Sequence, residues 1–310
     1  MSSKFDNYEI KKTTKYFFSF NNLNGEVGAT PSNFNILMNN PSFTNIQSYG
    51  RNTAVSLTPL SVVMDLKFFN VSETLSNNKI LITSTMVANS PITITIPDGY
   101  YSTFTLASTL QAQLEANARY IGTPTTSMGW AVDIQNAVNL RIRFNNAYVG
   151  ASAITKITFL HSVYDAKSLM GFSADSSDIA YATRAVGITG DLAMDMIPYD
   201  TLRICSNVAK RFWVKRNNVL IQSDILLEIP LIDYNLGSTI KWEATDDLYE
   251  QDILDDFGNI SFSIKDDDDN IIGFDATAKI NIQFSIKRTI TYPSPEEKIR
   301  AIQNYASYSS

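Results

Sequence analysis

Residues 92–116 read ITITIPDGYYSTFTLASTLQAQLEA and begin the one stretch of the chain that mixes strand and helix patterns. From Ile92 to Ile96, isoleucines alternate with threonines, which is the period of a half-buried strand. A Pro-Asp-Gly turn ends this strand. Ser102 or Thr103 then predicts the cap of a helix. The inward positions expected for that helix are Phe104, Ala107, Leu110 and Leu114.

The stretch continues with further short elements as far as Phe172. Trp130–Gln135 and Val138–Asn145 predict a hairpin, and Ile154–Leu160 predicts another alternating strand. Ala166–Phe172 predicts a short helix that stops near Gly171. Residues 91–172 therefore predict one small α/β unit, ordered strand, helix, three strands and helix.

The sequence on either side of this unit shows a different pattern, which predicts short strands separated by Asn-rich turns and few helices. The flanks offer about eight strands, divided near four and four, and Lys79–Val87 counts with the first half. Ile280, Ile282, Phe284 and Ile286 alternate along the final strand. Eight antiparallel strands in two sheets is the count of a jelly roll. We therefore predict a mainly β protein: a single eight-stranded jelly roll, a form of β-sandwich, with an inserted small α/β domain.

Five segments follow from this interpretation. They are an N-terminal arm (residues 1–15), the first half of the jelly roll (16–90), the insertion domain (91–198), the second half (199–292) and a C-terminal tail (293–310). We expect Lys4–Lys15 and Glu296–Ser310 to be mobile in the isolated protein.

Composition limits the function classes. Charged residues are 18 % of the 310 residues, below the roughly 25 % typical of soluble domains. Two explanations stay open: a surface largely covered by neighbouring subunits, or a host with an Asn/Ile/Lys-rich genome. The net charge of −6 argues against a dedicated nucleic-acid binder. The exception is the basic N-terminal arm, with Lys4, Lys11, Lys12 and Lys15, for which a solvated terminus is the favoured explanation. We expect no signal peptide and no membrane span.

The residues that usually carry catalysis are scarce. His161 is the only histidine and Cys205 the only cysteine. The apolar run around Cys205 predicts a buried thiol that acts as a small hydrophobic side chain. Nucleophile-elbow, phosphate-loop, dinucleotide-binding and paired-cysteine motifs do not occur in the sequence. We therefore predict that the protein is not an enzyme and has no catalytic, cofactor-binding or metal-binding residues.

Two acidic stretches bear on the prediction that the protein has no metal-binding or catalytic residues. Asp266, Asp268 and Asn270 have the spacing that begins a calcium loop, but Thr277 stands where such a loop needs its closing Glu. A solvated hairpin tip is favoured, and a structural calcium at a subunit contact stays open. The second stretch comprises Asp246, Asp247, Glu250, Asp252, Asp255 and Asp256. Nothing in the sequence fixes a carboxylate separation there, so a glycosidase site is disfavoured.

Two Asn-x-Ser sequences match the glycosylation pattern. They are Asn70-Val71-Ser72 and Asn259-Ile260-Ser261. Without a secretion signal they carry little weight.

The α/β unit has a recognisable likeness. IPDGYY, the paired strands after it and the closing LMGF resemble a segment of capsid proteins from eukaryotic DNA viruses related to virophages and Polinton-like elements. NISFSIKDDDDNIIGF, residues 259–274, is similar to a strand–turn–strand near the end of such proteins. The split β flanks resemble their minor capsid protein, the penton. The resemblance spans roughly residues 50–290.

The resemblance implies a structural function and no catalytic residue. It implies a jelly roll perpendicular to the shell, an insertion domain that projects outward, and pentamers at the icosahedral vertices that abut trimers of the major capsid protein. The expected location is the virion, after synthesis in the host cytoplasm. Whether the insertion domain binds a host or virus partner or only seals the vertex stays open. The alternative functions are a spike or fibre-type receptor-binding protein on a β scaffold and, less favoured, a carbohydrate-active or other enzyme.

Overall fold

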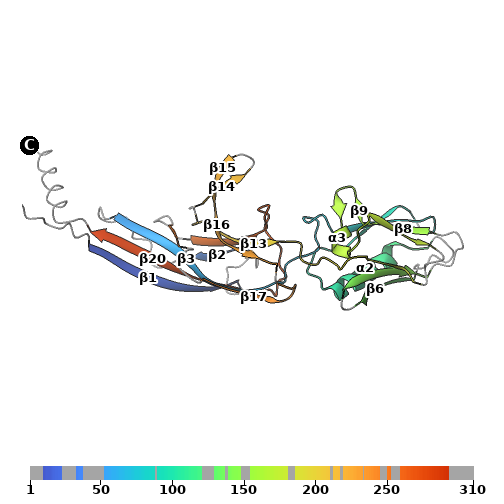
Figure 1. Cartoon of the computed structure of the whole chain (residues 1–310), viewed down its shortest axis with the longest axis horizontal. Helices are drawn as coiled ribbons and strands as arrows, with labels where there is room; N and C mark the ends of the chain where they lie inside the picture. The colour runs from blue at the N-terminus through green and yellow to red at the C-terminus, as the bar shows by residue number, and fades with distance from the viewer. Residues whose placement is uncertain are drawn as a thin grey trace, which may run out of the picture.

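The computed structural model describes residues 10–22, 33–37, 52–87, 89–120, 129–136, 139–147, 154–180, 186–209, 212–216, 219–232, 234–244, 250–252 and 259–292. These residues are mainly β, in antiparallel sheets. Buried hydrophobic side chains form two separate cores in this part of the chain. Figure 1 shows the two regions at opposite ends of an elongated molecule.

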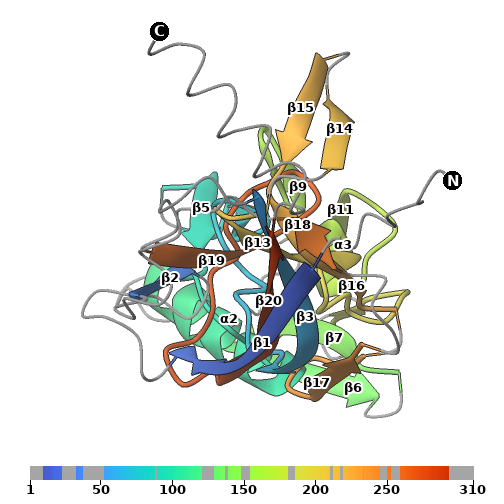
Figure 2. The same cartoon turned by 90° about the vertical axis from the view of Figure 1, so that its left-hand side faces the viewer.

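One sheet of the first region is built from strands at both ends of the sequence. Its order is β1 (Ile10–Asn21), β20 (Ile280–Tyr292), β3 (Asn52–Asp65) and β17 (Thr239–Glu243), and the short β18 (Gln251–Asp252) also pairs with β3. Every pairing is antiparallel. Figure 2 views this region along its length, with β1, β20 and β3 crossing the centre.

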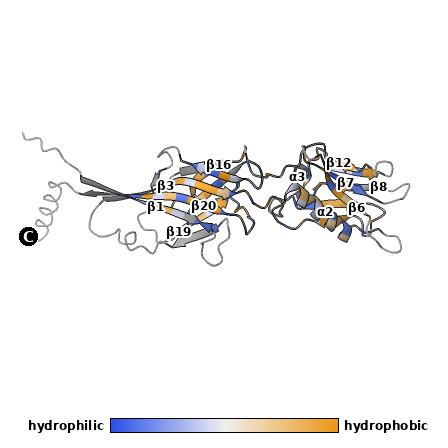
Figure 3. Cartoon of the chain, turned by 90° about the horizontal axis from the view of Figure 1, so that it is seen from below, coloured by the Kyte–Doolittle hydropathy of each residue, from blue (hydrophilic) through white to orange (hydrophobic). Residues whose placement is uncertain are grey.

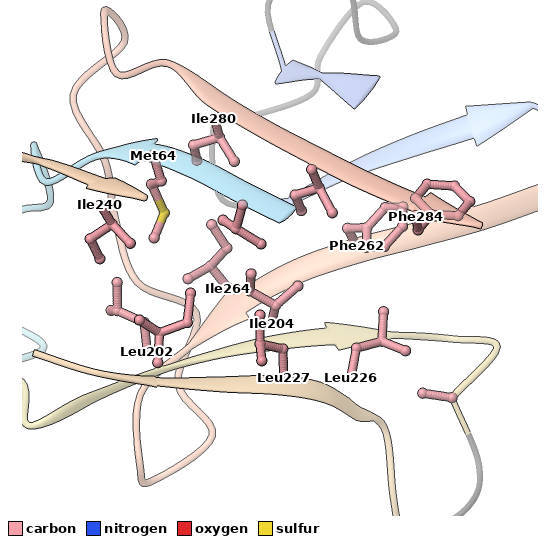
Figure 4. Close-up of a cluster of buried hydrophobic side chains, with 14 of the residues drawn as sticks. Met64, Leu202, Ile204, Leu226, Leu227, Ile240, Phe262, Ile264, Ile280 and Phe284 are labelled. Atoms are coloured by element: carbon pink, nitrogen blue, oxygen red, sulfur yellow. The ribbon is translucent and has the colours of Figure 1, made fainter. Parts of the chain in front are cut away.

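A second sheet lies against the first. Its order is β16 (Ile225–Pro230), β13 (Thr201–Ser206), β19 (Asn259–Lys265) and β2 (Asn33–Leu37). Figure 4 shows Met64 and Ile280 of the first sheet facing the same interior as Ile204 and Ile264 of the second. The two sheets therefore enclose one core in the manner of a β-sandwich, and this region is called the sandwich below.

Hydrophobic alternation explains why these strands pack on one face. Ile280, Ile282, Phe284 and Ile286 are all buried, as the period-two pattern predicts. Figure 3 shows hydrophobic and hydrophilic residues alternating along the sandwich strands. A single strand can therefore supply the core with one face and the surface with the other.

The second core lies within residues 71–196, which we call the lobe. One lobe sheet has the order β11 (Ser176–Ala180), β8 (Ile154–Thr158), β4 (Lys79–Thr83) and β5 (Ile92–Thr95); another has the order β12 (Ile188–Thr189), β7 (Arg141–Asn146) and β6 (Trp130–Asn136). Helices α2 (Thr103–Asn117) and α3 (Lys167–Met170) and the small hairpin of β9 (Leu160–His161) and β10 (Tyr164–Asp165) complete it.

Strand β4 departs from the expected grouping. The sequence predicted β4 to belong to the first half of the β flanks. In the structure β4 pairs with β5 and β8, and its buried side chains Ile80 and Ile82 belong to the second core. The two sandwich sheets thus take three of their paired strands, not four, from before the lobe. Alternating hydrophobic residues predict that one face of a strand is buried, but they do not predict which core that face packs against.

Helix α2 forms where the sequence predicts it, with one difference in its inward face. The Ser102 hydroxyl accepts a hydrogen bond from the backbone of Thr105, and the Thr105 hydroxyl accepts one from the backbone of Ser102, which is a capping box. Leu110 and Leu114 are buried as expected, but Phe104 is 61 % exposed. Leu106 occupies the inward position instead, because the helix turns 100° per residue and Leu106 lies closer to the Leu110 stripe.

The chain ends are described in part. Ile10–Lys15, expected to be a mobile arm, lies in β1 and pairs with β20. Lys4 and the tail Glu296–Ser310 are outside the described residues. In the part of the chain that the structure describes, no helix has the length and hydrophobicity needed to cross a membrane.

The aromatic centre of the sandwich core provides a stability test. Phe284 is 1 % exposed, and its ring stacks on Phe18 at 5.3 Å and lies 5.6 Å from Phe262, centroid to centroid. We expect Phe284→Ala to lower the free energy of unfolding by about 3–5 kcal/mol, because it removes buried surface and leaves a cavity. Urea unfolding followed by far-UV circular dichroism measures the change. Phe17→Ala, at a position 69 % exposed, is the control and should change stability by less than about 0.5 kcal/mol; equal losses for the two variants would contradict the assigned core.

Candidate functional site

The titratable residues singled out from the sequence do not converge. His161 lies on β9 of the lobe, whereas Cys205 lies on β13 in the sandwich. Among the residues that the structure describes, no group of three or more His, Cys, Asp or Glu side chains is placed to hold a metal ion.

Cys205 is a buried packing residue, as expected. Its side chain is 0 % exposed. Burial raises the pKa of the thiol to about 12, and the nearby Asp224 carboxylate acts in the same direction. A thiol with this pKa stays protonated at neutral pH and is a poor nucleophile.

The acidic tip Asp266–Asn270 is a tight turn. The Asp266 carboxylate accepts hydrogen bonds from the backbone N–H groups of Asp268 and Asn270, at 2.9 and 2.8 Å. Asp267 forms an ion pair with Arg203, with 3.1 Å between the guanidinium nitrogen and the carboxylate oxygen. The Asp266 side chain thus holds the turn itself, while Asp267 and Asp268 are exposed.

The second acidic stretch is described only at Glu250 and in the backbone of β18. Glu250 accepts hydrogen bonds from the Ser56 hydroxyl and from the Lys287 ammonium group, and these two interactions lower the pKa of its carboxyl. Glu250 therefore ties the segment before β18 to β3 and β20. Asp246, Asp247, Asp255 and Asp256 lie outside the described residues, as does the side chain of Asp252.

Two chain segments connect the sandwich with the lobe, and we call them the neck: residues 66–71 on the way out and 194–201 on the way back. Asn70 joins them. Its side-chain Nδ2 donates to the carbonyl oxygens of Tyr101 and Met196, at 3.0 and 3.3 Å, and its Oδ1 accepts from the Tyr101 N–H at 2.9 Å. Asn70 is 0 % exposed, so its side chain is a buried clasp rather than an accessible glycosylation acceptor. The side chain of Asn259 is outside the described residues.

Aromatic side chains close the neck on the sandwich side. The Phe68 and Tyr199 rings meet edge to face with centroids 5.0 Å apart, and the Tyr199 hydroxyl donates to the Phe69 carbonyl at 3.3 Å. Burial raises the pKa of Tyr199, so the hydroxyl keeps its proton and remains a donor. Leu236 packs against both cores. These contacts hold the outgoing and returning segments together.

The Pro-Asp-Gly motif has a structural role at the base of the lobe. Gly99 and Val71 exchange both backbone hydrogen bonds, at 2.9 and 3.3 Å. The Asp98 carboxylate accepts from the Glu73 N–H and from the Asn78 side-chain amide, each at 3.0 Å. The motif therefore fixes the start of helix α2 against the segment that enters the lobe.

The Leu-Met-Gly-Phe motif ends helix α3. Gly171 has a φ of +70°, and a Cβ there would stand 2.5 Å from the Leu192 carbonyl oxygen. Phe172, the next residue, stacks on Phe159 with 4.0 Å between centroids. The glycine thus permits both the left-handed cap and the close approach of the chain at Leu192.

Two hollows lie on the lobe and at its junction with the sandwich. One, of about 390 Å³, is lined by residues of the neck and of both regions, among them Tyr100, Met196 and Leu236. The other, of about 450 Å³, lies between α2 and β6 and is lined by Phe104, Ala112 and Ile134 among others. Asp133 at this second hollow is held in an ion pair with Arg143. Neither hollow gathers the convergent titratable groups of a catalytic site.

Several large hydrophobic side chains of the lobe are exposed. Those described are Phe104, Ile154, Leu160, Val163, Val186 and Leu192. Val163, at the turn between β9 and β10, is 73 % exposed. Neither the exposure of these side chains nor the hydrogen bonds of Asn70 were predicted from the sequence. The partners of Asn70 lie 31 and 126 residues away, a separation that local patterns cannot register.

Asn70 provides a test of the neck. We expect Asn70→Ala to lower the free energy of unfolding by about 3 kcal/mol or more, because the buried Tyr101 N–H and two carbonyl groups lose their partner. Thermal and urea unfolding measure this loss, and Asn117→Ala, at an exposed position, is the matched control. An Asn70→Ala protein as stable as the control would show that the clasp does not hold the neck.

Gly171 provides a second test, with Gly237 as its control. Both have positive φ, but a Cβ at Gly237 meets only the hydroxyl end of the Tyr100 side chain, which can move. We expect Gly237→Ala to cost about 1 kcal/mol and Gly171→Ala about 3 kcal/mol or more, because backbone strain and a backbone clash add. Chemical unfolding of both variants gives the comparison, and equal costs would contradict the clash at Leu192.

Similarity to known proteins is found at the level of solved structures. No protein-family model and no curated protein matches the sequence. Among solved structures, the chain is similar to the mavirus penton protein, whose crystal structure was determined from selenomethionine-labelled protein: the two sequences are 10 % identical, the match covers 89 % of this chain and 99 % of that chain, and the TM-score is 0.48. A penton is the kind of minor capsid protein that the sequence resembles.

Proposed function

We propose that this chain is a structural capsid protein of penton type, with a jelly-roll domain in the shell and an inserted domain that caps a vertex. The observation that carries the proposal is the pairing pattern of the sandwich strands. The sequence motifs IPDGYY and LMGF also support it, because they resemble a segment of capsid proteins from eukaryotic DNA viruses related to virophages and Polinton-like elements.

The sandwich strands pair as one long hairpin that has been rolled up. Apart from the two-residue β18, which pairs with β3, the two sheets contain eight described strands, in chain order β1, β2, β3, β13, β16, β17, β19 and β20. The first pairs with the last, the second with the seventh, the third with the sixth and the fourth with the fifth. Rolling such a hairpin places the eighth strand beside the third and the seventh beside the fourth, and both of these pairings are present. This pairing pattern supports the proposed eight-stranded jelly roll with two Greek keys.

The lobe then corresponds to an insertion between the third and fourth strands of the jelly roll. The second core begins at Val71 and ends at Met196. We therefore propose an insertion domain of residues 71–196, which starts some twenty residues earlier than the segment 91–198 expected from the sequence. The Asn70 hydrogen bond to Met196 supports this boundary, because it joins the two ends of the insertion.

A jelly roll with an insertion at one end suits a vertex of an icosahedral shell. We propose that five copies form a closed ring that abuts trimers of the major capsid protein, and that the protein resides in the virion after synthesis in the host cytoplasm. A closed ring requires that one face of each subunit fit a different face of its neighbour. The low content of charged residues is compatible with a surface that neighbours cover.

A receptor-binding spike on a β scaffold is the second candidate function. It is favoured by the exposed hydrophobic side chains of the lobe, which are accessible to a partner, since binding residues often lie on the surface of a displayed domain. The two functions agree on the scaffold and differ in the oligomer and in the role of the lobe.

The oligomeric mass tests the proposal. Native mass spectrometry of the purified chain, at 34.6 kDa per copy, should give a species of five copies. If the free chain stays monomeric, cryo-electron microscopy of particles assembled with the major capsid protein should place it at the vertices. A trimer in solution, or particles with vertices that lack this chain, would contradict the penton function.

Excision of the lobe separates the two roles. Because Asn70 and Met196 are in contact, a short Gly-Ser linker can replace residues 71–196 without displacing the sandwich ends. We expect this variant to fold and to occupy vertices. Particles that carry it should be compared with native particles for attachment to host cells. Unchanged attachment would exclude a recognition role for the lobe.

A further inference from the structure

We propose that the hairpin of β14 (Phe212–Arg216) and β15 (Val219–Ser223) is an arm that binds an acidic surface of a second copy of this chain. The inference rests on the proposed ring, for which it supplies one side of the contact between neighbouring subunits.

The arm stands apart from the sandwich. In the described part of the chain, β14 and β15 pair with each other and with no other strand. Figures 1 and 2 both show the hairpin projecting from the sandwich, beyond β13 and β16. Strands β13 and β16 already pair up to Cys205 and Ile225, so the arm is an excursion at the end of a complete hairpin. The sandwich does not need it to close its sheets.

The residues of the arm are unusually apolar for a projecting hairpin. Six of its ten strand residues are Phe212, Trp213, Val214, Val219, Leu220 and Ile221. In the register Val214 is opposite Ile221, and Lys215 is opposite Leu220. An isolated two-stranded hairpin is only marginally stable in water, so a surface that covers these residues would stabilise it.

The basic charge of the arm indicates that the surface it binds is acidic. Residues 210–216 read Lys-Arg-Phe-Trp-Val-Lys-Arg, and no acidic residue occurs from Ser206 to Ser223. The chain nevertheless has a net charge of −6, so a basic arm is complementary to the rest of the same chain. A segment with this charge is attracted to an acidic surface and repelled by other arms.

The acidic turn between β19 and Ile271 fits the arm in both charge and polarity. It carries four consecutive carboxylates, Asp266–Asp269, and Arg203 pairs with Asp267. Ile271 beside it is 50 % exposed and offers an apolar contact next to the acidic group. Arm and turn are different surfaces of one chain, so their contact between copies is heterologous and can close a ring.

A basic hairpin with aromatic residues is also typical of nucleic-acid binding. The second copy is favoured because four of the six apolar residues of the arm are aliphatic, and aliphatic side chains do not stack on bases as aromatic ones do.

A charge-swap experiment tests the arm. Native chain, K215E/R216E, D268K/D269K and the combination of all four changes are compared by sedimentation equilibrium over a range of protein and salt concentrations. K156E/K241E, which reverses two exposed lysines on β8 and β17, is the matched control. We expect each arm or turn variant to weaken self-association about tenfold or more, the combined variant to restore much of it, and the control to behave as the native chain.

Each other outcome counts against the arm. If K215E/R216E associates as well as the native chain, the arm does not contribute to self-association. If that variant still forms a species of five copies, the proposed ring stands and only the arm contact is wrong. A native chain that stays monomeric throughout also overturns this inference, while the vertex location is decided separately by cryo-electron microscopy. Loss of single-stranded DNA binding in K215E/R216E, with self-association unchanged, would assign the arm to nucleic acid.

A second measurement does not depend on the fold of these variants. A photo-crosslinking amino acid at Trp213, in a mixture of isotopically light and heavy native-length chains, should give light–heavy crosslinks to residues 259–279. Crosslinks between copies at other peptides would overturn the assigned acceptor. Crosslinks within one copy alone would overturn the arm.

Discussion

The antiparallel pairing of β20 with both β1 and β3 is the constraint on which the rest of the structure depends. β20 pairs with the whole of β1 and, from Ile280 to Thr291, with β3, so residues more than two hundred positions apart form one sheet. Since the N-terminal and C-terminal strands lie side by side in this sheet, a segment that folds around a second core must leave the sandwich and return to it. The second sheet obeys the same rule, because β2 pairs with β19. The lobe can therefore fold around its own core without interrupting the sandwich.

The neck has backbone polar groups that must be paired outside the sheets. Two segments that cross between two cores expose backbone groups that neither sheet pairs, and unpaired buried polar groups are destabilising. Asn70 pairs three of these groups with one side chain, and Tyr199 pairs the carbonyl of Phe69. A joint of this kind holds the outgoing and returning segments together, which the proposed display of the lobe from a capsid shell requires.

Much of the local structure could be predicted from the sequence. The alternation of Ile280, Ile282 and Phe284 and the capping residue Ser102 each specify an element by themselves, and the structure confirms each. Phe104 was placed on the wrong face: it lies six residues before Leu110, and at 100° per residue this puts it about 120° away from the buried Leu110. The grouping of β4 failed for another reason: a half-buried strand fits either core equally well.

The sequence by itself determined the mainly β class, the position of α2, the inert character of Cys205 and the contrast between the β flanks and residues 91–172. These follow from periodicity, capping and local hydrophobicity, which act over a few residues. Only the tertiary structure decided that β4 belongs to the second core, that Asn70 is a buried clasp, and that the Phe212–Ser223 hairpin stands away from the sheets. The physical reason is that these features depend on contacts between residues far apart in the chain, whose energies appear only when the sheets close.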